Sequence, residues 1–301
     1  MILELWFLYA MGAALFAALT TILAKIGIKE VDSHFAAAVR TVVVLVFAWL
    51  MVLVVGSQRD IRYIQAETWV LLVLSGLATG GSWLCFFRAL KLGDVNKVVP
   101  IDKSSTVLTM LLAFVLLREP LRPPTLAGMV LIGVGTGLML ELRSKKNDPT
   151  ETGRPSEKNG KSWLVYAVLA AVLASVVAII GKMGVAEMDA TLWTAIRTVV
   201  VVPLSWLMVG IAGHKPSSGR TKVGRKSWVF LLLSGVATGA SWLFFYHALQ
   251  IGNAIHVVPI DKLSIVFTMG FARVFLGERF SRRSVFGLAL LTVGTLLPVM
   301  V

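Results

Sequence analysis

Residues 75–105, SGLATGGSWLCFFRALKLGDVNKVVPIDKSS, decide the fold, because the chain contains this stretch twice. Residues 234–264, SGVATGASWLFFYHALQIGNAIHVVPIDKLS, align with it without gaps, and 19 of the 31 positions are identical. Self-similarity of this kind is the sequence signature of a repeated structural unit. We therefore expect two halves with the same fold.

The match continues on both sides of this stretch. Upstream, Lys25 and Arg40 correspond to Lys182 and Arg197, and downstream Glu119 corresponds to Glu278. The duplication therefore spans essentially the whole chain. Between the halves lies a charged segment with few apolar residues, which is typical of a solvated linker. The predicted organisation is a first repeat, a linker and a second repeat, at residues 1–142, 143–161 and 162–301.

The composition indicates a membrane protein. Of the 301 residues, 57% are hydrophobic, and the mean hydropathy is +0.82. A soluble domain has about 45–50% apolar residues. The net charge of +13 comes from basic residues between the apolar segments, which favours membrane loops over a nucleic-acid surface. The apolar segments are long enough to cross a bilayer of about 30 Å. We expect an all-α integral membrane protein with ten transmembrane helices, near residues 5–28, 34–56, 67–91, 95–117, 122–142, 163–186, 190–212, 227–250, 254–276 and 283–300.

Five spans per repeat determine how the halves are related. Because five is odd, the second copy must enter the membrane from the opposite side, which gives two inverted five-helix repeats. Many secondary transporters have this arrangement. Basic residues concentrate in the linker and in the gaps near 213–226 and 277–283. By the positive-inside rule this predicts a cytoplasmic linker with both termini outside.

Charged residues inside the predicted spans recur at equivalent places in both halves. A charge within a span costs at least about 2.5 kcal/mol on insertion scales, so each one needs a reason. Each cluster holds three cations and one carboxylate, and the two clusters are expected in opposite leaflets. They consist of Lys25, Arg40, Asp102 and Lys103 in the first half, and of Lys182, Arg197, Asp261 and Lys262 in the second.

Three interpretations of these clusters remain open. The aspartates pair with the arginines or with a lysine to hold helices together, or they lie in the headgroup zone, or they contact a substrate or a proton. Lys103 and Lys262 lie about 100° around the helix from the aspartates, so we expect them to serve a different neighbour or to snorkel. The surplus positive charge favours a solute with an anionic group, such as the carboxylate of an amino acid. Ser105 and Ser264, on the aspartate face of their helices, join the candidate site, and Thr109 and Thr268 share that face.

Of all the predicted spans, the third helix of each half carries the polar and aromatic residues that lie nearest the middle of the membrane. Thr79 and Trp83 lie one turn apart, and Thr238 and Trp242 repeat them. Neighbouring glycines allow close helix approach, so these residues serve packing or line a solute path. Near the end of this helix the two halves carry different polar residues, Arg88 in the first half and His247 in the second.

The end of each half resembles a known family. The turn at 277–281, GERFS, followed by FGLALLTVG at 286–294, resembles the end of an EamA domain, and Arg118-Glu119-Pro120-Leu121 with Gly128 and Gly135 is a looser copy. Two such repeats resemble the drug/metabolite transporter superfamily. The resemblance implies ten transmembrane helices around a central cavity, export of amino acids or other metabolites, and cytoplasmic termini. The charge distribution predicts the opposite orientation, which we retain.

The predicted function is a secondary transporter that exports an amino acid or related solute across the cytoplasmic membrane by alternating access. Its expected partners are the lipid bilayer, a small-molecule substrate and, as a coupling ion, protons. The alternatives are a carrier of phosphorylated metabolites or anionic lipid head groups, and a membrane-embedded enzyme. The sequence has no Gly-x-Ser-x-Gly motif, phosphate-binding loop or metal-ligand cluster, so we expect no catalysis and no cofactor.

Overall fold

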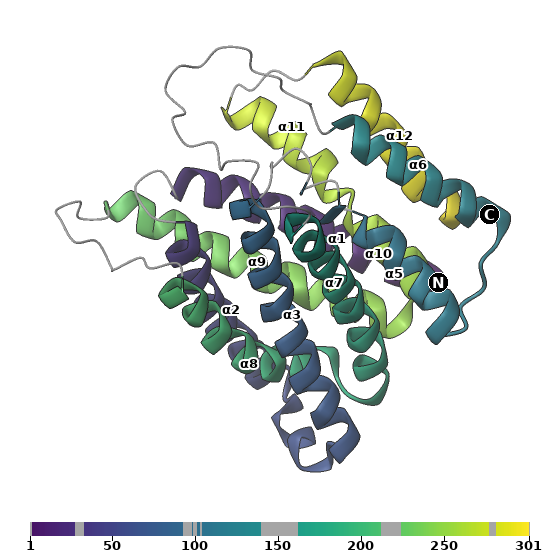
Figure 1. Cartoon of the computed structure of the whole chain (residues 1–301). Helices are drawn as coiled ribbons and strands as arrows, with labels where there is room; N and C mark the ends of the chain where they lie inside the picture. Colours follow the sequence, from purple (N-terminus) through teal and green to yellow (C-terminus); the bar gives the residue numbers. More distant parts are fainter. Residues whose placement is uncertain are drawn as a thin grey trace. The chain divides into compact units, whose positions relative to one another are not determined.

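The computed structural model describes residues 2–27, 33–92, 98, 101–102, 104–139, 162–211, 224–276 and 281–300. Throughout these ranges the secondary structure is helical, with no strand (Figure 1). The fold class is therefore all-helical, as the sequence predicts. The linker 143–161 and the positions Asp32, Lys103 and Glu278 lie outside the described residues.

The first three helices of the first half agree with the predicted spans to within a few residues, and the described parts of the fourth and fifth lie inside theirs. Their bounds are α1 Ile2–Gly27, α2 Ser33–Val55, the short 3-10 helix η2 Ser57–Tyr63, α3 Ala66–Leu92, α5 Ser105–Leu116 and α6 Pro123–Met139.

The second half follows the same order with one division. Its helices are α7 Ser162–Glu187, α8 Ala190–Ile211, α9 Arg225–Ile251, α10 Ala254–Asp261, α11 Ser264–Leu276 and α12 Arg282–Met300. Within the described ranges eight segments are long and apolar enough to cross a membrane, with α10 and α11 forming one of them. The apolar helices α5 and α6 are shorter.

The fourth span of the second half is interrupted beside its charged residues. Pro259 predicts a kink, and the helix breaks just after it, at Lys262 and Leu263. The Leu263 N–H donates to the Ile260 carbonyl at 2.9 Å, which is a tight i→i+3 turn. The equivalent bond in the first half, from Ser104 N–H to the Ile101 carbonyl, measures 3.2 Å. Both copies therefore form the same tight turn next to the Asp-Lys pair.

The chain forms two compact units, and each unit draws on both halves. The first unit contains Met1–Gly80 and Val177–Arg279, and the second contains Gly81–Val176 and Phe280–Val301. The boundaries fall within α3 and α7. The two compact units therefore do not coincide with the two sequence repeats.

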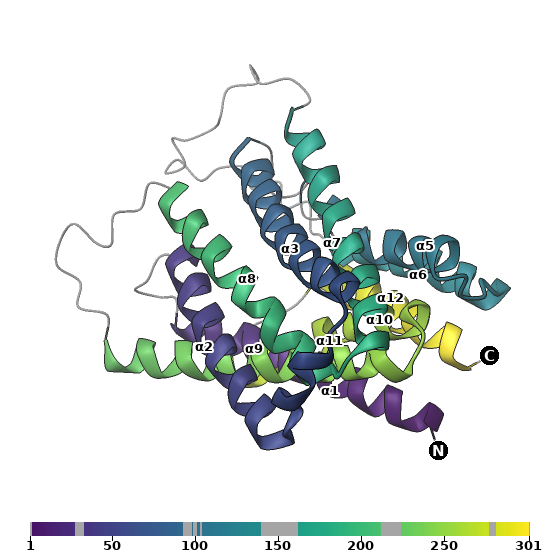
Figure 2. The same cartoon turned by 90° about the horizontal axis from the view of Figure 1, so that it is seen from below.

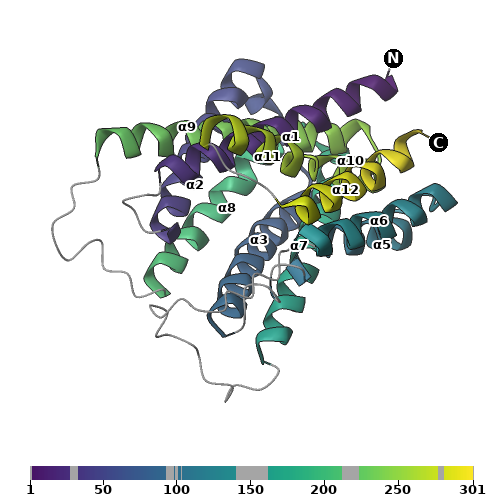
Figure 3. The same cartoon turned by 90° about the horizontal axis from the view of Figure 1, so that it is seen from above.

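The helices of the first unit pack through glycines that occupy equivalent positions in the two halves. Helix α2 packs against α8 and α9, and α1 lies along α9 (Figures 2 and 3). A Cβ built on Gly76 in α3 would lie 2.6 Å from Val200 in α8. A Cβ on Gly235 in α9 would lie 2.6 Å from Val43 in α2. The second helix of each half therefore packs against the third helix of the other half.

The second unit has a seam of small residues between α6 and α12, which lie side by side (Figure 1). A Cβ on Gly128 would lie 2.6 Å from the Gly294 carbonyl oxygen. One on Gly135 would lie 2.6 Å from the Leu291 backbone nitrogen. These contacts are to backbone, which cannot move aside, so only glycine allows the helices to approach this closely.

Candidate functional site

The candidate site forms around Arg197, a buried arginine of α8 in the first unit. Only 3% of this residue is exposed. Its Nε donates a hydrogen bond to Ser75 Oγ at 3.0 Å, and its Nη2 donates to Thr79 Oγ1 at 2.7 Å. Thr79 in turn donates its hydroxyl hydrogen to the Ser75 carbonyl at 2.8 Å. One turn of α3 thus holds one edge of the guanidinium.

Two aromatic rings of α9 also contact this guanidinium. Its Cζ lies 5.0 Å from the ring centroid of Trp242 and 5.4 Å from that of Tyr246. A cation over an aromatic face is stabilised by about 0.5–2 kcal/mol, with the larger value where water is excluded. Hydroxyls and aromatic faces therefore solvate the positive charge in place of water.

The guanidinium of Arg197 retains one unused donor group. Its Nη1 is buried and has no hydrogen-bond partner in the described part of the chain. Among the described residues, the hydrogen bonds of Arg197 go to hydroxyls, and it forms no ion pair with a carboxylate. A buried charge without a counter-ion is costly unless a ligand supplies one. Because guanidinium donors match carboxylate and phosphate oxygens, this group can bind the anionic part of a solute.

The start of α8 fixes where this arginine lies. Asp189 Oδ1 accepts hydrogen bonds from the backbone N–H groups of Thr191 and Leu192, both at 3.0 Å, so Asp189 is the N-cap of α8. One turn into the helix, Trp193 is fully buried against Tyr246, with ring centroids 6.2 Å apart. This packing anchors the helical turn that precedes Arg197.

His247 occupies a position at which the two halves have different residues. Its side chain links α9 to α8 and α1. Its Nε2 lies 3.2 Å from Thr191 Oγ1 in α8. Its ring stacks on Tyr9 of α1 with centroids 5.4 Å apart and an interplanar angle of 24°. These contacts give the histidine a structural role beside the first turn of α8.

Lys182 lies apart from the arginine as a helix cap. Its Nζ donates to the carbonyl oxygens of Leu249 at 2.6 Å and Gly252 at 2.8 Å, at the end of α9. A cation at this position satisfies the last carbonyls and the negative end of the helix dipole. The cations grouped together in the sequence thus have different local roles.

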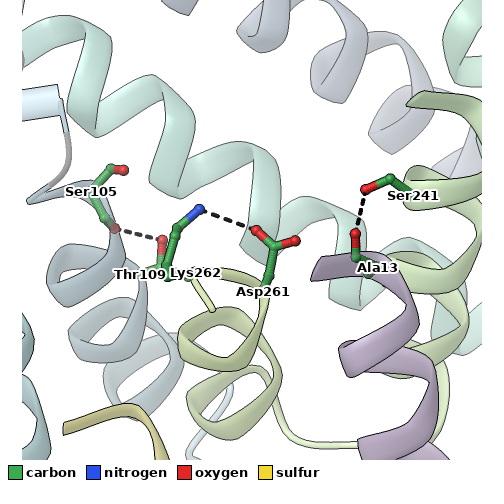
Figure 4. Close-up of polar contacts among 6 residues, drawn as sticks. All are labelled: Ala13, Ser105, Thr109, Ser241, Asp261 and Lys262. Atoms are coloured by element: carbon green, nitrogen blue, oxygen red, sulfur yellow. Dashed lines mark hydrogen bonds and ion pairs between the residues drawn. The ribbon is translucent and has the colours of Figure 1, made fainter. Parts of the chain in front are cut away.

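Asp261 and Lys262 pair with each other at the break between α10 and α11. The Lys262 Nζ lies 3.3 Å from Asp261 Oδ2, and both side chains are partly exposed (Figure 4). The expectation that Lys262 serves a different neighbour is wrong, because it pairs with Asp261. Of the open interpretations of the aspartates, pairing with a lysine is the one that the structure shows at Asp261, whereas Arg197 donates to hydroxyls.

Arg40, the first-half counterpart of Arg197, has different surroundings. It is half-buried, and its Nε is buried without a hydrogen-bond partner among the residues that the structure describes. The hydroxyls equivalent to those that hold Arg197 belong to Ser234 and Thr238, and both contact Thr20 of α1. Ser234 Oγ donates to the Thr20 carbonyl at 3.1 Å, and Thr238 Oγ1 lies 3.3 Å from Thr20 Oγ1.

The remaining predicted site residues are distributed over both units. In the second unit, the Ser105 carbonyl accepts a hydrogen bond from Thr109 Oγ1 at 2.8 Å (Figure 4). It also accepts one from Ser175 Oγ at 3.0 Å. Lys103 lies outside the described residues. Three further predicted residues are half-buried: Trp83, Asp102 and Ser264. Of the predicted set, Thr79 and Trp242 each contact Arg197, and Asp261 contacts Lys262.

Sequence reasoning missed two members of this group, Ser75 and Tyr246. Both residues could have been found from the sequence repeat and the helical spacing. Ser75 lies one turn before Thr79 on the same helix face and is identical to Ser234 in the second copy. Tyr246 lies one turn after Trp242. Extending each polar or aromatic pair by one helical turn finds both residues.

One contact recurs in both copies with the same geometry. Ser241 of α9 donates to the Ala13 carbonyl of α1 at 2.9 Å (Figure 4). Its counterpart Ser82 of α3 donates to the Ala170 carbonyl of α7, also at 2.9 Å. The third helix of each half therefore bonds to the first helix of the other half, so the repeat is present in the structure as well as in the sequence.

Comparison with known proteins agrees with these features. The model of the EamA-like transporter family matches twice, at residues 4–141 and 161–300. A solved crystal structure of another protein has a TM-score of 0.79 and 19% sequence identity, covering 98% of this chain and 96% of that chain, which shows the fold. The chain is thus a multi-pass membrane protein built from two copies of one transporter unit, and it belongs to the EamA-like transporter family.

A curated relative from Sinorhizobium sp. matches one half of the chain. It is described as an uncharacterized transporter in the cobO 3′ region and is 42% identical over 139 residues. The match covers 96% of the relative and 46% of this chain, so the relative is roughly half as long.

Proposed function

We propose that this transporter is a secondary carrier of a small organic solute with an anionic group. An amino acid or related metabolite, exported across the cytoplasmic membrane by alternating access, fits best. The observation that supports this proposal is the buried Arg197 guanidinium with its unused Nη1 and without a carboxylate partner among the described residues. The adjacent Trp242 and Tyr246 rings provide an apolar surface for the rest of the solute.

The proposed topology is ten spans in two inverted five-helix repeats, with the 143–161 linker in the cytoplasm. Counting α10 and α11 as one span, and α5 and α6 as the cores of two more, gives five spans on each side of the linker. The equivalent serine bonds of the two halves support a pseudo-symmetric arrangement. Maleimide labelling of a cysteine placed at Ser144, in a Cys85→Ser background, tests the side on which the linker lies.

A carrier of phosphorylated metabolites or anionic head groups is the second candidate. The same unused guanidinium edge favours it, because phosphate oxygens match arginine donors as well as carboxylate oxygens do. Aromatic rings beside the guanidinium favour a compact solute with an apolar part. Protons remain the proposed coupling ion for either substrate class.

Uptake into proteoliposomes separates these candidates. Purified protein is reconstituted and screened with labelled amino acids, organic phosphates and a short-chain anionic lipid, with and without a pH gradient. We expect saturable amino-acid transport that Arg197→Gln reduces by about 10- to 100-fold, because a hydrogen bond to a charged group contributes about 1.5–3 kcal/mol. Arg225→Gln, at the exposed start of α9, serves as the control for loss of a charge. Undiminished transport by the Arg197→Gln protein contradicts the proposal, and transport of phosphates alone supports the second candidate.

A further inference from the structure

The two arginines of the repeat differ in what holds them, although their helices pack in the same way. Val200 and Val43, three residues beyond Arg197 and Arg40, both rest on a glycine of the opposing helix, Gly76 or Gly235. A Cβ on Gly235 would lie 3.2 Å from the Arg40 carbonyl oxygen. Backbone packing therefore places each arginine next to a Ser-x-x-x-Thr pair of hydroxyls.

Only one arginine uses its pair. Arg197 donates to both hydroxyls of its pair, Ser75 and Thr79. Among the described residues, Arg40 leaves its Nε without a hydrogen bond. Ser234 Oγ donates to the backbone carbonyl of Thr20, and Thr238 Oγ1, which donates to the Ser234 carbonyl at 2.7 Å, lies 3.3 Å from Thr20 Oγ1. The arrangement around Arg197 shows that an arginine on this backbone geometry can reach such a pair.

Only the contact with Thr238 depends on the side chain of Thr20, because Ser234 bonds the Thr20 backbone carbonyl. The position equivalent to Thr20 in the second half is Val177, as Arg40 and Arg197 are also 157 residues apart. Valine cannot bond Thr79, so Thr79 is available to Arg197. Thr20 supplies a hydroxyl to Thr238, so one difference in sequence accompanies the difference in arginine bonding.

We propose that Thr238 exchanges partners during transport, from the Thr20 hydroxyl to Arg40, and that Thr20 keeps Arg40 available for the solute before the exchange. This rests on the proposed transport function. While Thr238 contacts Thr20, the Arg40 guanidinium binds the anionic group of the solute, through a carboxylate or phosphate oxygen. When Thr238 accepts from Arg40, its hydroxyl replaces the solute oxygen and the solute is released. Arg40 thus forms a second anion-binding position, and Thr20 is its positioning residue.

The first test needs no substrate. Melting temperatures are measured for the full chain in detergent with Thr20→Val, Arg40→Gln and both changes. The Thr20→Val change frees Thr238 for Arg40, so Arg40→Gln should lower the melting temperature by about 2–4 °C more in that background than in the native one. Arg197→Gln in the same two backgrounds is the matched control and should have equal effects. Equal effects of Arg40→Gln in both backgrounds overturn the proposal.

The second test traps the exchange by a cross-link. In a Cys85→Ser background, Thr20→Cys and Thr238→Cys place two thiols where the hydroxyls lie 3.3 Å apart. Oxidation should stop transport in proteoliposomes, and reduction should restore it, while each single-cysteine variant should be insensitive to the oxidant. Equal transport by the cross-linked and reduced forms overturns the exchange. If the native protein transports none of the solutes, that result contradicts the proposed function instead. The melting-temperature experiment then still tests the exchange of hydrogen-bond partners.

Discussion

The environments of Arg197 and Arg40 differ although the sequence around the two residues is repeated. Arg197 donates two hydrogen bonds to hydroxyls of α3 and lies beside two aromatic rings. Arg40 has a buried Nε without a partner, and the corresponding hydroxyls of α9 contact α1. The duplication thus reproduces backbone packing without reproducing the polar contacts.

This difference shows how a symmetric fold can have unequal sites. Backbone packing depends on glycines and valines that both copies retain. A hydroxyl hydrogen bond depends on a single atom of a neighbouring helix, and at Thr20 and Val177 that atom differs. Because an unpaired buried donor costs about 1–3 kcal/mol, one hydroxyl is enough to decide which arginine is satisfied within the protein.

The largest expected effect is the difference in transport between substitutions of Arg197 and of Arg40. Arg197→Lys should reduce transport by at least about tenfold, because an ammonium cannot bond Ser75 and Thr79 and also present a planar donor to the solute. Arg40→Lys should cost less, since only the solute contact is lost. The ratio of transport rates in proteoliposomes at equal protein amounts measures the difference. Equal losses at both positions would show that the contrast between the sites has no role in transport.

The threonines provide a second, smaller contrast. Thr79→Val removes the acceptor of the 2.7 Å bond from Arg197 Nη2 and should lower transport about five- to tenfold, with a fall in melting temperature. Thr238→Val removes a contact of 3.3 Å to Thr20 and should lower the melting temperature less. Differential scanning fluorimetry of both proteins gives the comparison. A larger fall for Thr238→Val contradicts the assignment of the stronger bond.

The glycines should behave alike, in contrast to the polar residues. Gly76→Ala and Gly235→Ala each place a Cβ about 2.6 Å from a valine, and we expect each to destabilise the protein by about 1–3 kcal/mol. Gly210→Ala in α8 is the control, because its Cβ would meet nothing within 4 Å. Unfolding in denaturant measures all three. A large difference between Gly76→Ala and Gly235→Ala would show that the backbone packing is also asymmetric.

The smallest effect concerns the repeated serine bonds. Ser82→Ala and Ser241→Ala each remove one hydrogen bond of 2.9 Å to a carbonyl, and each should cost about 0.5–1.5 kcal/mol. We expect the two melting temperatures to fall by similar amounts. If only one of the two variants is destabilised, the pseudo-symmetry does not extend to these contacts.

Much of the fold is readable from the sequence because apolar segments, their lengths and a repeat are local properties. The spans at α1, α2, α3, α7, α8 and α9 lie within a few residues of their predicted bounds. The break after Asp261 was placed near Pro259 but not located, because it depends on turn bonds that form within the folded segment. Of the candidate site, Thr79, Arg197 and Trp242 were named in advance, and their mutual contact was not.

The sequence by itself determined the membrane class, the duplicated helical architecture and the identity of the charged residues within the spans. Only the tertiary structure decided their partners. Asp261 pairs with the adjacent Lys262, Lys182 caps α9, and Arg197 is held by hydroxyls. The physical reason is that these properties differ in range. Hydrophobicity and helix periodicity are properties of neighbouring residues in the sequence. A hydrogen bond requires two atoms within about 3 Å, and the packing of helices from different parts of the sequence decides which atoms come that close.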